Sequence, residues 1–189
     1  ISKFSQLSIF SQLNNLYNIS MLPKYAALCG ITQQELEDNF QEGISGLAQS
    51  QNISKDDVLQ KLKRQYDGYH FAAKSPGVYN PFSLLYAMDT EQICNYWFAT
   101  GTPTFLVKMI RKFHTDITKI DGSLASAQEF DAPTEDMHSI LPLFYQSGYI
   151  TIKDYDPILD SYTLGFPNEE VKVGLLYTLV PYYVDRDTN

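Results

Sequence analysis

Cysteine and histidine are scarce in this chain. Its 189 residues contain two cysteines, Cys29 and Cys94, and three histidines that lie in unrelated segments. No Cys-x-x-Cys pair is present, so the usual zinc sites are excluded and we expect no metal site. Two isolated cysteines predict small, buried apolar side chains rather than a disulfide framework.

Basic residues are also few, since 14 Lys and Arg stand against 22 Asp and Glu, for a net charge of −8. A general phosphate-binding surface is therefore excluded. Two local basic groups are interpreted as solvated helix faces: Lys61, Lys63 and Arg64, and Lys108, Arg111 and Lys112. Nucleic-acid binding is left open but is not favoured.

Long hydrophobic runs are missing. No stretch approaches the ~20 apolar residues that span a bilayer, and the polar start lacks the apolar core of a signal peptide. We expect a cytoplasmic protein without a membrane partner. The chain starts at Ile1 rather than Met, and residues 185–189 carry no cap, so we expect a fragment of a longer protein.

The sequence contains no G-x-x-x-x-G-K-[ST] loop and no G-x-G-x-x-G string, so nothing in it is expected to hold a triphosphate. No Ser-His-Asp or Cys-His arrangement is present either, and we predict no catalytic residue. His70, between two aromatic residues, is interpreted as a packing histidine with satisfied hydrogen bonds. Glu170-Val171-Lys172 matches the E-x-K string of PD-(D/E)xK nucleases. It follows an Asn cap at a helix start, where acids are ordinary, and this argues against a nuclease.

Helix signals dominate the first two thirds. Thr32 with Glu35 forms a capping box that starts a helix over 32–50, with a break allowed at the glycines of 43–46. Ser54 caps a helix over 55–65, and Asn80-Pro81 starts one that runs to about Met88. Further helices are predicted over 90–98 and from Thr102-Pro103 through Phe113.

The last third mixes helix and strand. We expect a loop with at most one short helix over 115–138, a helix at 141–147, and Gly148 as its cap. Strands over 149–152 and 161–165 form a hairpin, and Asn168 caps a final helix. The predicted fold is mainly α with a small β-hairpin, and this order is that of a winged helix.

Aromatic residues are plentiful, with 14 Tyr and 11 Phe. Three clusters occur, at 66–71, 96–98 and 182–183. Exposed aromatic rings can stack on bases, but in an acidic chain core or domain-interface positions are the favoured interpretation.

Several segments together resemble the predicted AAA-ATPase-like family of bacteria, in the part that follows its Walker motifs. They are SKFS and NNL (2–5 and 14–16), YDGYHF (66–71), VYNPFS (78–83), YWFATGTP (96–103), QSGYITIK (146–153) and LGFPNEEV (164–171). Members of this family often carry a PD-(D/E)xK nuclease-like domain after the ATPase part. The resemblance covers almost the whole chain, and the motifs occur in the family's order.

The resemblance implies three regions. Residues 1–20 would end the ATPase core, where Asn14 or Asn15 would sense the γ-phosphate or simply cap a turn. Residues 21–115 would form a helical lid region, with the lid candidates Tyr66, Asp67, Gly68 and Tyr69. Residues 116–189 would form the winged-helix-like part.

ATP and Mg would then be bound by the parent protein and not by this chain. The partners would be an upstream ATPase core and a downstream nuclease-like domain. The expected function is that of a lid and regulatory fragment that couples nucleotide state to an attached domain. A winged-helix nucleic-acid-binding module or a protein-interaction module is the alternative.

Overall fold

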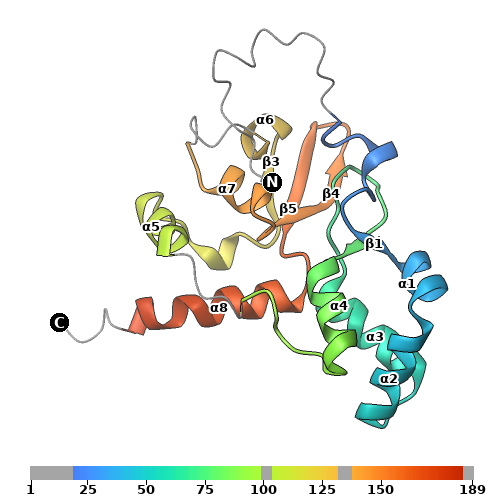
Figure 1. The fold of residues 1–189 in the computed structure, drawn as a ribbon. Helices are drawn as coiled ribbons and strands as arrows, with labels where there is room; N and C mark the ends of the chain where they lie inside the picture. The colour runs from blue at the N-terminus through green and yellow to red at the C-terminus, as the bar shows by residue number, and fades with distance from the viewer. Residues whose placement is uncertain (1–18, 99–103, 132–137, 185–189) are drawn as a thin grey trace, which may run out of the picture.

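The computed structural model describes residues 19–98, 104–131 and 138–184. Helices make up about half of these residues, and two small antiparallel sheets complete the fold (Figure 1). The expectation of a mainly helical chain with a β-hairpin is therefore confirmed at this level. No described helix is both long and apolar enough to cross a membrane.

The first half of the chain builds one hydrophobic core from four helices. These are α1 (Gln33–Asn39), α2 (Gln41–Gln51), α3 (Lys55–Tyr66) and α4 (Pro81–Thr90), preceded by the short 3-10 helix η1 (Pro23–Tyr25). A two-stranded sheet of β1 (Ile31–Thr32) and β2 (Val78–Tyr79) joins the start of α1 to the start of α4. We call this the first core; its fully buried members include Leu36, Leu47, Leu62 and Leu84.

The capping signals of the first core are confirmed. Thr32 and Glu35 form both bonds of the capping box, Ser54 accepts from the Asp57 N–H, and Asn80 accepts from the Phe82 N–H. The helix predicted over 32–50 is two helices that break at Phe40, and not at the glycines. Both glycines lie inside α2, and added Cβ atoms would approach the side chains of Met88 to 2.9 Å and of Glu91 to 3.0 Å, so close packing favours glycine here.

The helix predicted over 90–98 is wrong. Glu91 adopts the left-handed conformation and ends α4, and the chain then continues without helix to Phe98. Hydrogen bonds from distant residues replace helical ones here: the Tyr66 hydroxyl donates to the Cys94 carbonyl at 2.7 Å and accepts from the Cys94 N–H at 3.0 Å. We call residues 91–98 the linker.

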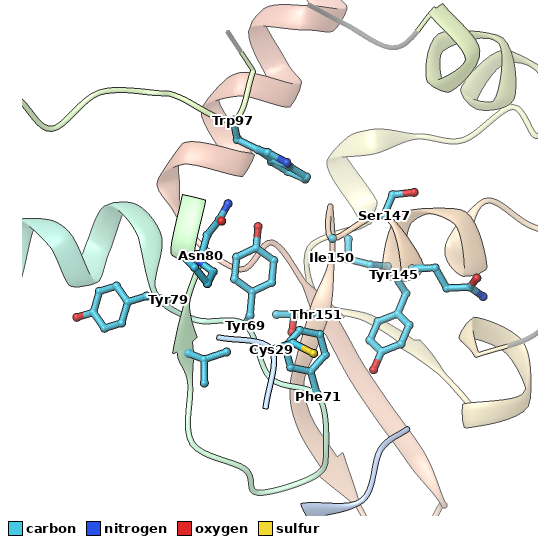
Figure 2. A pocket seen from close by; sticks show the side chains of 14 residues that line it. Cys29, Tyr69, Phe71, Tyr79, Asn80, Trp97, Tyr145, Ser147, Ile150 and Thr151 are labelled. Carbon is cyan, nitrogen blue, oxygen red and sulfur yellow. The ribbon is translucent and has the colours of Figure 1, made fainter. Parts of the chain in front are cut away.

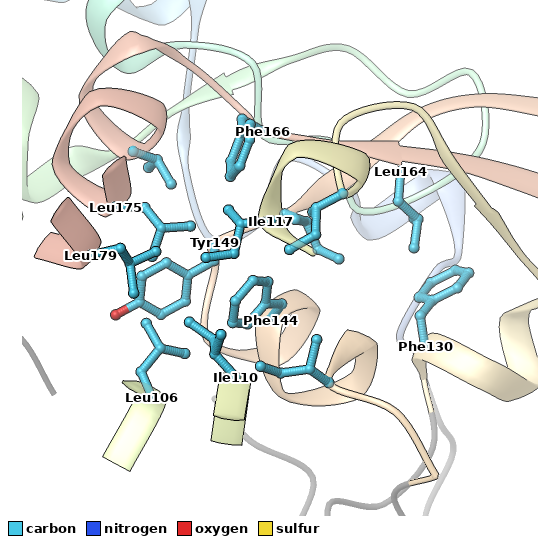
Figure 3. Close-up of a cluster of buried hydrophobic side chains, with 14 of the residues drawn as sticks. Leu106, Ile110, Ile117, Phe130, Phe144, Tyr149, Leu164, Phe166, Leu175 and Leu179 are labelled. Atoms are coloured by element: carbon cyan, nitrogen blue, oxygen red, sulfur yellow. The ribbon is translucent and has the colours of Figure 1, made fainter. Parts of the chain in front are cut away.

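The second half builds a separate hydrophobic core, the second core (Figure 3). Its elements are α5 (Thr104–Lys112), the 3-10 helix η2 (Ile117–Lys119), β3 (Ser123–Ala125), α6 (Ala127–Phe130), α7 (Leu141–Gln146), β4 (Thr151–Asp156), β5 (Ser161–Gly165) and α8 (Glu169–Val184). The three strands form an antiparallel sheet in the order β3-β5-β4. Aromatic rings fill much of this core, and Phe144 and Phe130 are fully buried.

Two expectations about this half are corrected. The stretch 115–138 contains the strand β3, which pairs Ser123 with Leu164 and was not expected. Three residues are too few for a local strand pattern, and the pairing partner lies far away in the sequence. On the helix predicted from Thr102-Pro103, apolar spacing predicts that Phe105 is buried, but its side chain is exposed.

The cysteines are also corrected. Cys29 and Cys94 are both exposed and free, and not buried. Each lies in an irregular segment, directly before β1 and in the linker, where the backbone runs over the surface.

Candidate functional site

The four lid candidates lie where the two cores meet. Tyr66 ends α3 and is fully buried in the first core, whereas Tyr69 packs against the second core. Asp67 and Gly68 form the turn between them. We call residues 66–70 the junction, because this short segment belongs to both cores.

Gly68 allows the closest approach at the junction. It adopts a φ of +106°, a conformation that L side chains rarely take. A Cβ atom at this position would overlap the carbonyl oxygen of Pro167, in the loop before α8. The Lys153 amine donates to the same carbonyl at 3.1 Å. Only glycine permits this contact between the two halves of the chain.

Lys153 and Asp67 place opposite charges beside that contact. Burial lowers the pKa of Lys153, and the carboxylates of Asp121 and Asp67 partly offset the effect. Asp67 is only 9% exposed, and its Oδ1 atom has no hydrogen-bond partner in the part of the chain that the structure describes. A Cβ atom on Gly77 would lie 3.0 Å from that oxygen and 3.4 Å from His70 Nε2, so Asp67, His70 and Gly77 are close neighbours.

His70 ties the junction to β4. Its backbone N–H donates to Thr151 Oγ1 at 2.7 Å, and the Thr151 hydroxyl donates to the His70 carbonyl at 2.9 Å. The ring Nδ1 lies 2.8 Å from the Ser75 carbonyl. This hydrogen bond of one ring nitrogen agrees with the interpretation of His70 as a packing histidine.

Glu170 makes a second tie between the halves. Its side chain is fully buried in the first turn of α8, and Oε1 accepts the backbone N–H groups of Tyr96 at 2.7 Å and Trp97 at 3.0 Å. Burial raises the pKa of Glu170, and the hydrogen bonds that it accepts partly offset this rise. The Ser83 hydroxyl of α4 also lies near this carboxylate and helps to hold its pKa down. The carboxylate thus anchors the linker to α8.

Sequence reasoning missed this role of Glu170. The helix start at Asn168 is confirmed, since Asn168 Oδ1 accepts from the Val171 N–H at 3.1 Å. Glu170 sat in the expected first turn, where an exposed acid is ordinary. Its apolar neighbours Phe166 and Val171 were a signal of burial that the charge pattern concealed.

An open pocket of about 230 Å³ lies beside the junction (Figure 2). Tyr69 and Trp97 point into it from the junction and the linker, and Tyr145 and Ser147 border it from the end of α7. No acidic or basic side chain is among the residues that line it. This pocket can accommodate a neutral group against aromatic rings, but it offers no charged group for catalysis.

Two sequence predictions cannot be placed. Asn14 and Asn15, the nucleotide-sensing candidates, lie outside the described residues. Within 19–98, 104–131 and 138–184, no group of three or more His, Cys, Asp or Glu side chains could hold a metal ion. What the described part of the chain offers is a set of ties between the two cores.

The chain is similar to an uncharacterised protein from the vnfD 5′ region of Azotobacter chroococcum mcd 1. The two are 35% identical over an alignment 192 positions long, which covers 97% of this chain and 34% of that protein. The chain thus spans about a third of the length of the relative that it matches. No family model matches the chain, and no solved structure matches it either.

Proposed function

We propose that this chain is the lid and coupling portion of an AAA-type ATPase-like protein, which transmits nucleotide state to an attached domain. The observation that carries the proposal is the junction, a five-residue segment shared by two hydrophobic cores. Because cores are close-packed, a displacement of α3 in the first core must move the residues that touch the second core. Two cores joined in this way suit a relay and need no active site of their own.

The similarity to a longer protein supports this role. The match extends over nearly all of this chain but about a third of the relative. The sequence also has no phosphate-binding loop. In this proposal an upstream ATPase core binds ATP and Mg, a nuclease-like domain follows, and the whole protein works in the cytoplasm.

The element order of the second half supports a winged-helix-like part in this proposal. Helix α5, strand β3, helices α6 and α7, and the hairpin β4-β5 follow one another, and β3 pairs with β5 at the centre of the sheet. A helical unit beside a three-stranded antiparallel sheet with a long hairpin is the arrangement of a winged helix. The hairpin is then the wing, and α7 corresponds to the helix that many such domains use for recognition.

The charges favour coupling over nucleic-acid recognition. Between residues 142 and 171, Lys153 is the only Lys or Arg, and its amine binds the Pro167 carbonyl. The hairpin itself carries the acids Asp154, Asp156 and Asp160, which repel phosphates. We therefore place protein–protein coupling ahead of nucleic-acid binding.

Nucleotide titration with hydrogen exchange tests the proposal. The complete natural polypeptide should bind an ATP analogue, whereas the 189-residue chain should not. Nucleotide should slow exchange of the His70, Tyr96 and Trp97 amides, which form the ties between the cores, and should leave the Ile44 amide of α2 unchanged as the control. Equal nucleotide affinity in the two proteins, or unchanged exchange at the junction, would contradict the proposal.

A further inference from the structure

Helix α4 presents apolar side chains on both of its sides. Leu84 and Ala87 are fully buried in the first core. On the outer side, Phe82 is 52% exposed, Leu85 47% and Tyr86 48%. A surface helix ordinarily carries polar residues on its outer face, so the outer side of α4 requires an explanation.

These outer side chains form a continuous patch. The ring centroids of Phe82 and Tyr86 are 5.6 Å apart, and those of Tyr86 and the linker residue Tyr96 are 5.0 Å apart. The Tyr96 hydroxyl donates to the Gln92 carbonyl at 2.8 Å, so the last ring is held in place. We call Phe82, Leu85, Tyr86 and Tyr96 the α4 patch. Clustered aromatic and aliphatic groups of this kind mark interaction surfaces, whereas single exposed apolar residues do not.

The charged residues in the segment that carries the patch are all acidic. Residues 81–98 contain Asp89 and Glu91 and no Lys, Arg or His. Both acids are exposed at the end of α4. A surface that docks here gains from basic side chains at its edge, because complementary charges steer association and reject other partners.

We propose that the α4 patch docks an apolar, basic-edged surface from another part of the same longer polypeptide. The relative leaves room for such a partner, since this chain matches only 34% of its length. The inference rests on the proposed function in one respect, that the docking surface belongs to the same polypeptide. Docking itself requires no nucleotide. The docking surface then lies on α4, and Glu170 binds the linker that follows this helix.

The two free cysteines provide a direct test. Cys94 lies in the linker, two residues before Tyr96 of the patch, and Cys29 lies before β1; both are exposed. The rate of iodoacetamide labelling at each thiol is measured by peptide mass spectrometry, in the 189-residue chain and in the complete polypeptide. If the docked state outweighs the open state roughly nine to one, labelling of Cys94 slows about tenfold in the complete polypeptide. Labelling of Cys29 is the internal reference.

Two matched variants of the complete polypeptide sharpen the test. Leu85→Glu places a charge in the patch and should restore fast labelling of Cys94. Leu159→Glu makes the same change at an exposed leucine in the β4-β5 turn, and it should leave Cys94 protected. Circular dichroism of both variants checks that the fold is retained.

Three outcomes would overturn the inference. Cys94 could label equally fast in both proteins, or Leu159→Glu could restore labelling as well as Leu85→Glu does. Protection of Cys94 in the 189-residue chain that grows with concentration, together with sedimentation of a dimer, would assign the patch to a second copy. A complete polypeptide that protects Cys94 but binds no ATP analogue would support this inference while contradicting the proposed function.

Discussion

The two cores of this molecule are built by different means. The first core consists of four helices whose ends are set by neighbouring residues, such as the Thr32–Glu35 capping box and the Ser54 cap. The second core depends on distant partners. Strand β3 pairs with β5, which lies about 40 residues later in the sequence, and Phe130 packs edge-on against Tyr162. Local signals therefore set the helix ends of the first core, whereas the three-stranded sheet of the second core forms only when remote segments meet.

The two cores are joined to each other by noncovalent contacts. Cys29 and Cys94 are free thiols, and no group of three or more His, Cys, Asp or Glu side chains in the described ranges could hold a metal ion. The ties include the glycine contact at Gly68, the His70–Thr151 pair, the buried carboxylate of Glu170 and the exposed Arg64–Glu169 ion pair. The strength of these contacts decides whether the two cores unfold as one unit.

The largest effects should come from truncation of either core. Phe144→Ala in the second core should lower the free energy of unfolding by about 4 kcal/mol, and Leu62→Ala in the first core by about 3 kcal/mol. Urea unfolding is followed by circular dichroism for the helices and by fluorescence of Trp97, the single tryptophan, whose ring lies 5.0 Å from that of Tyr149. If the junction couples the cores, both probes shift together in each variant. Leu62→Ala shifting only the dichroism curve would show that the cores unfold independently.

The next effect tests the glycine contact. Gly68→Ala should cost about 3 kcal/mol, from a strained backbone and from overlap with the Pro167 carbonyl. Gly122→Ala is the matched control, because Gly122 also has a positive φ, of +87°, but no atom lies within 4 Å of its added Cβ. It should cost about 1 kcal/mol from backbone strain alone. Equal losses of stability in urea would remove the special role of the Pro167 contact.

A smaller effect, the pH dependence of stability, tests Glu170. Its pKa is raised in the folded chain above the ordinary value of 4.5, so between pH 4.5 and the raised pKa the folded state holds a proton that the unfolded state has lost. The free energy of unfolding should therefore fall as the pH rises through the raised pKa. Glu170→Gln should abolish this fall, so the variant gains relative to the parent as the pH rises.

The matched control is Glu169→Gln, one residue earlier, which removes an exposed ion pair with Arg64 at 3.0 Å. It should retain the fall in stability with pH. The test is to measure the free energy of unfolding of both variants from pH 4.5 upward. If this free energy still falls with pH in Glu170→Gln, another titrating group causes the fall.

The smallest expected effect is the pH dependence of stability from Glu35 in the first core. Its sign is opposite to that of Glu170. Hydrogen bonds from the Thr32 N–H and hydroxyl hold the pKa of Glu35 below its ordinary value of 4.5. The stabilisation is complete above pH 4.5 and is lost as the pH falls through the lowered pKa. Glu35→Gln should therefore unfold slightly more easily than the parent at neutral pH, and this difference should vanish in acid. Thermal unfolding at both pH values detects it.

Most of the fold could be predicted from the sequence where short-range chemistry decides it. The capped helices, the Gly148 cap and the β4-β5 hairpin were predicted from residues a few positions apart. The 90–98 helix was wrong because Tyr66 and Glu170 capture its backbone groups from far away. The junction residues 66–69 were selected by resemblance, and the structure brings them together with Lys153, Pro167 and Thr151, which no local pattern links to them.

The sequence by itself determined where the helices of the first core begin and end, since caps and turns depend on neighbours in the chain. It also determined the lack of a phosphate-binding loop, which is a matter of residue order. Only the tertiary structure decided that β3 enters a sheet, that Glu170 is buried, and that one side of α4 stays apolar and open. These properties depend on which distant surfaces meet and exclude water, and residue order alone does not encode that in any short-range pattern.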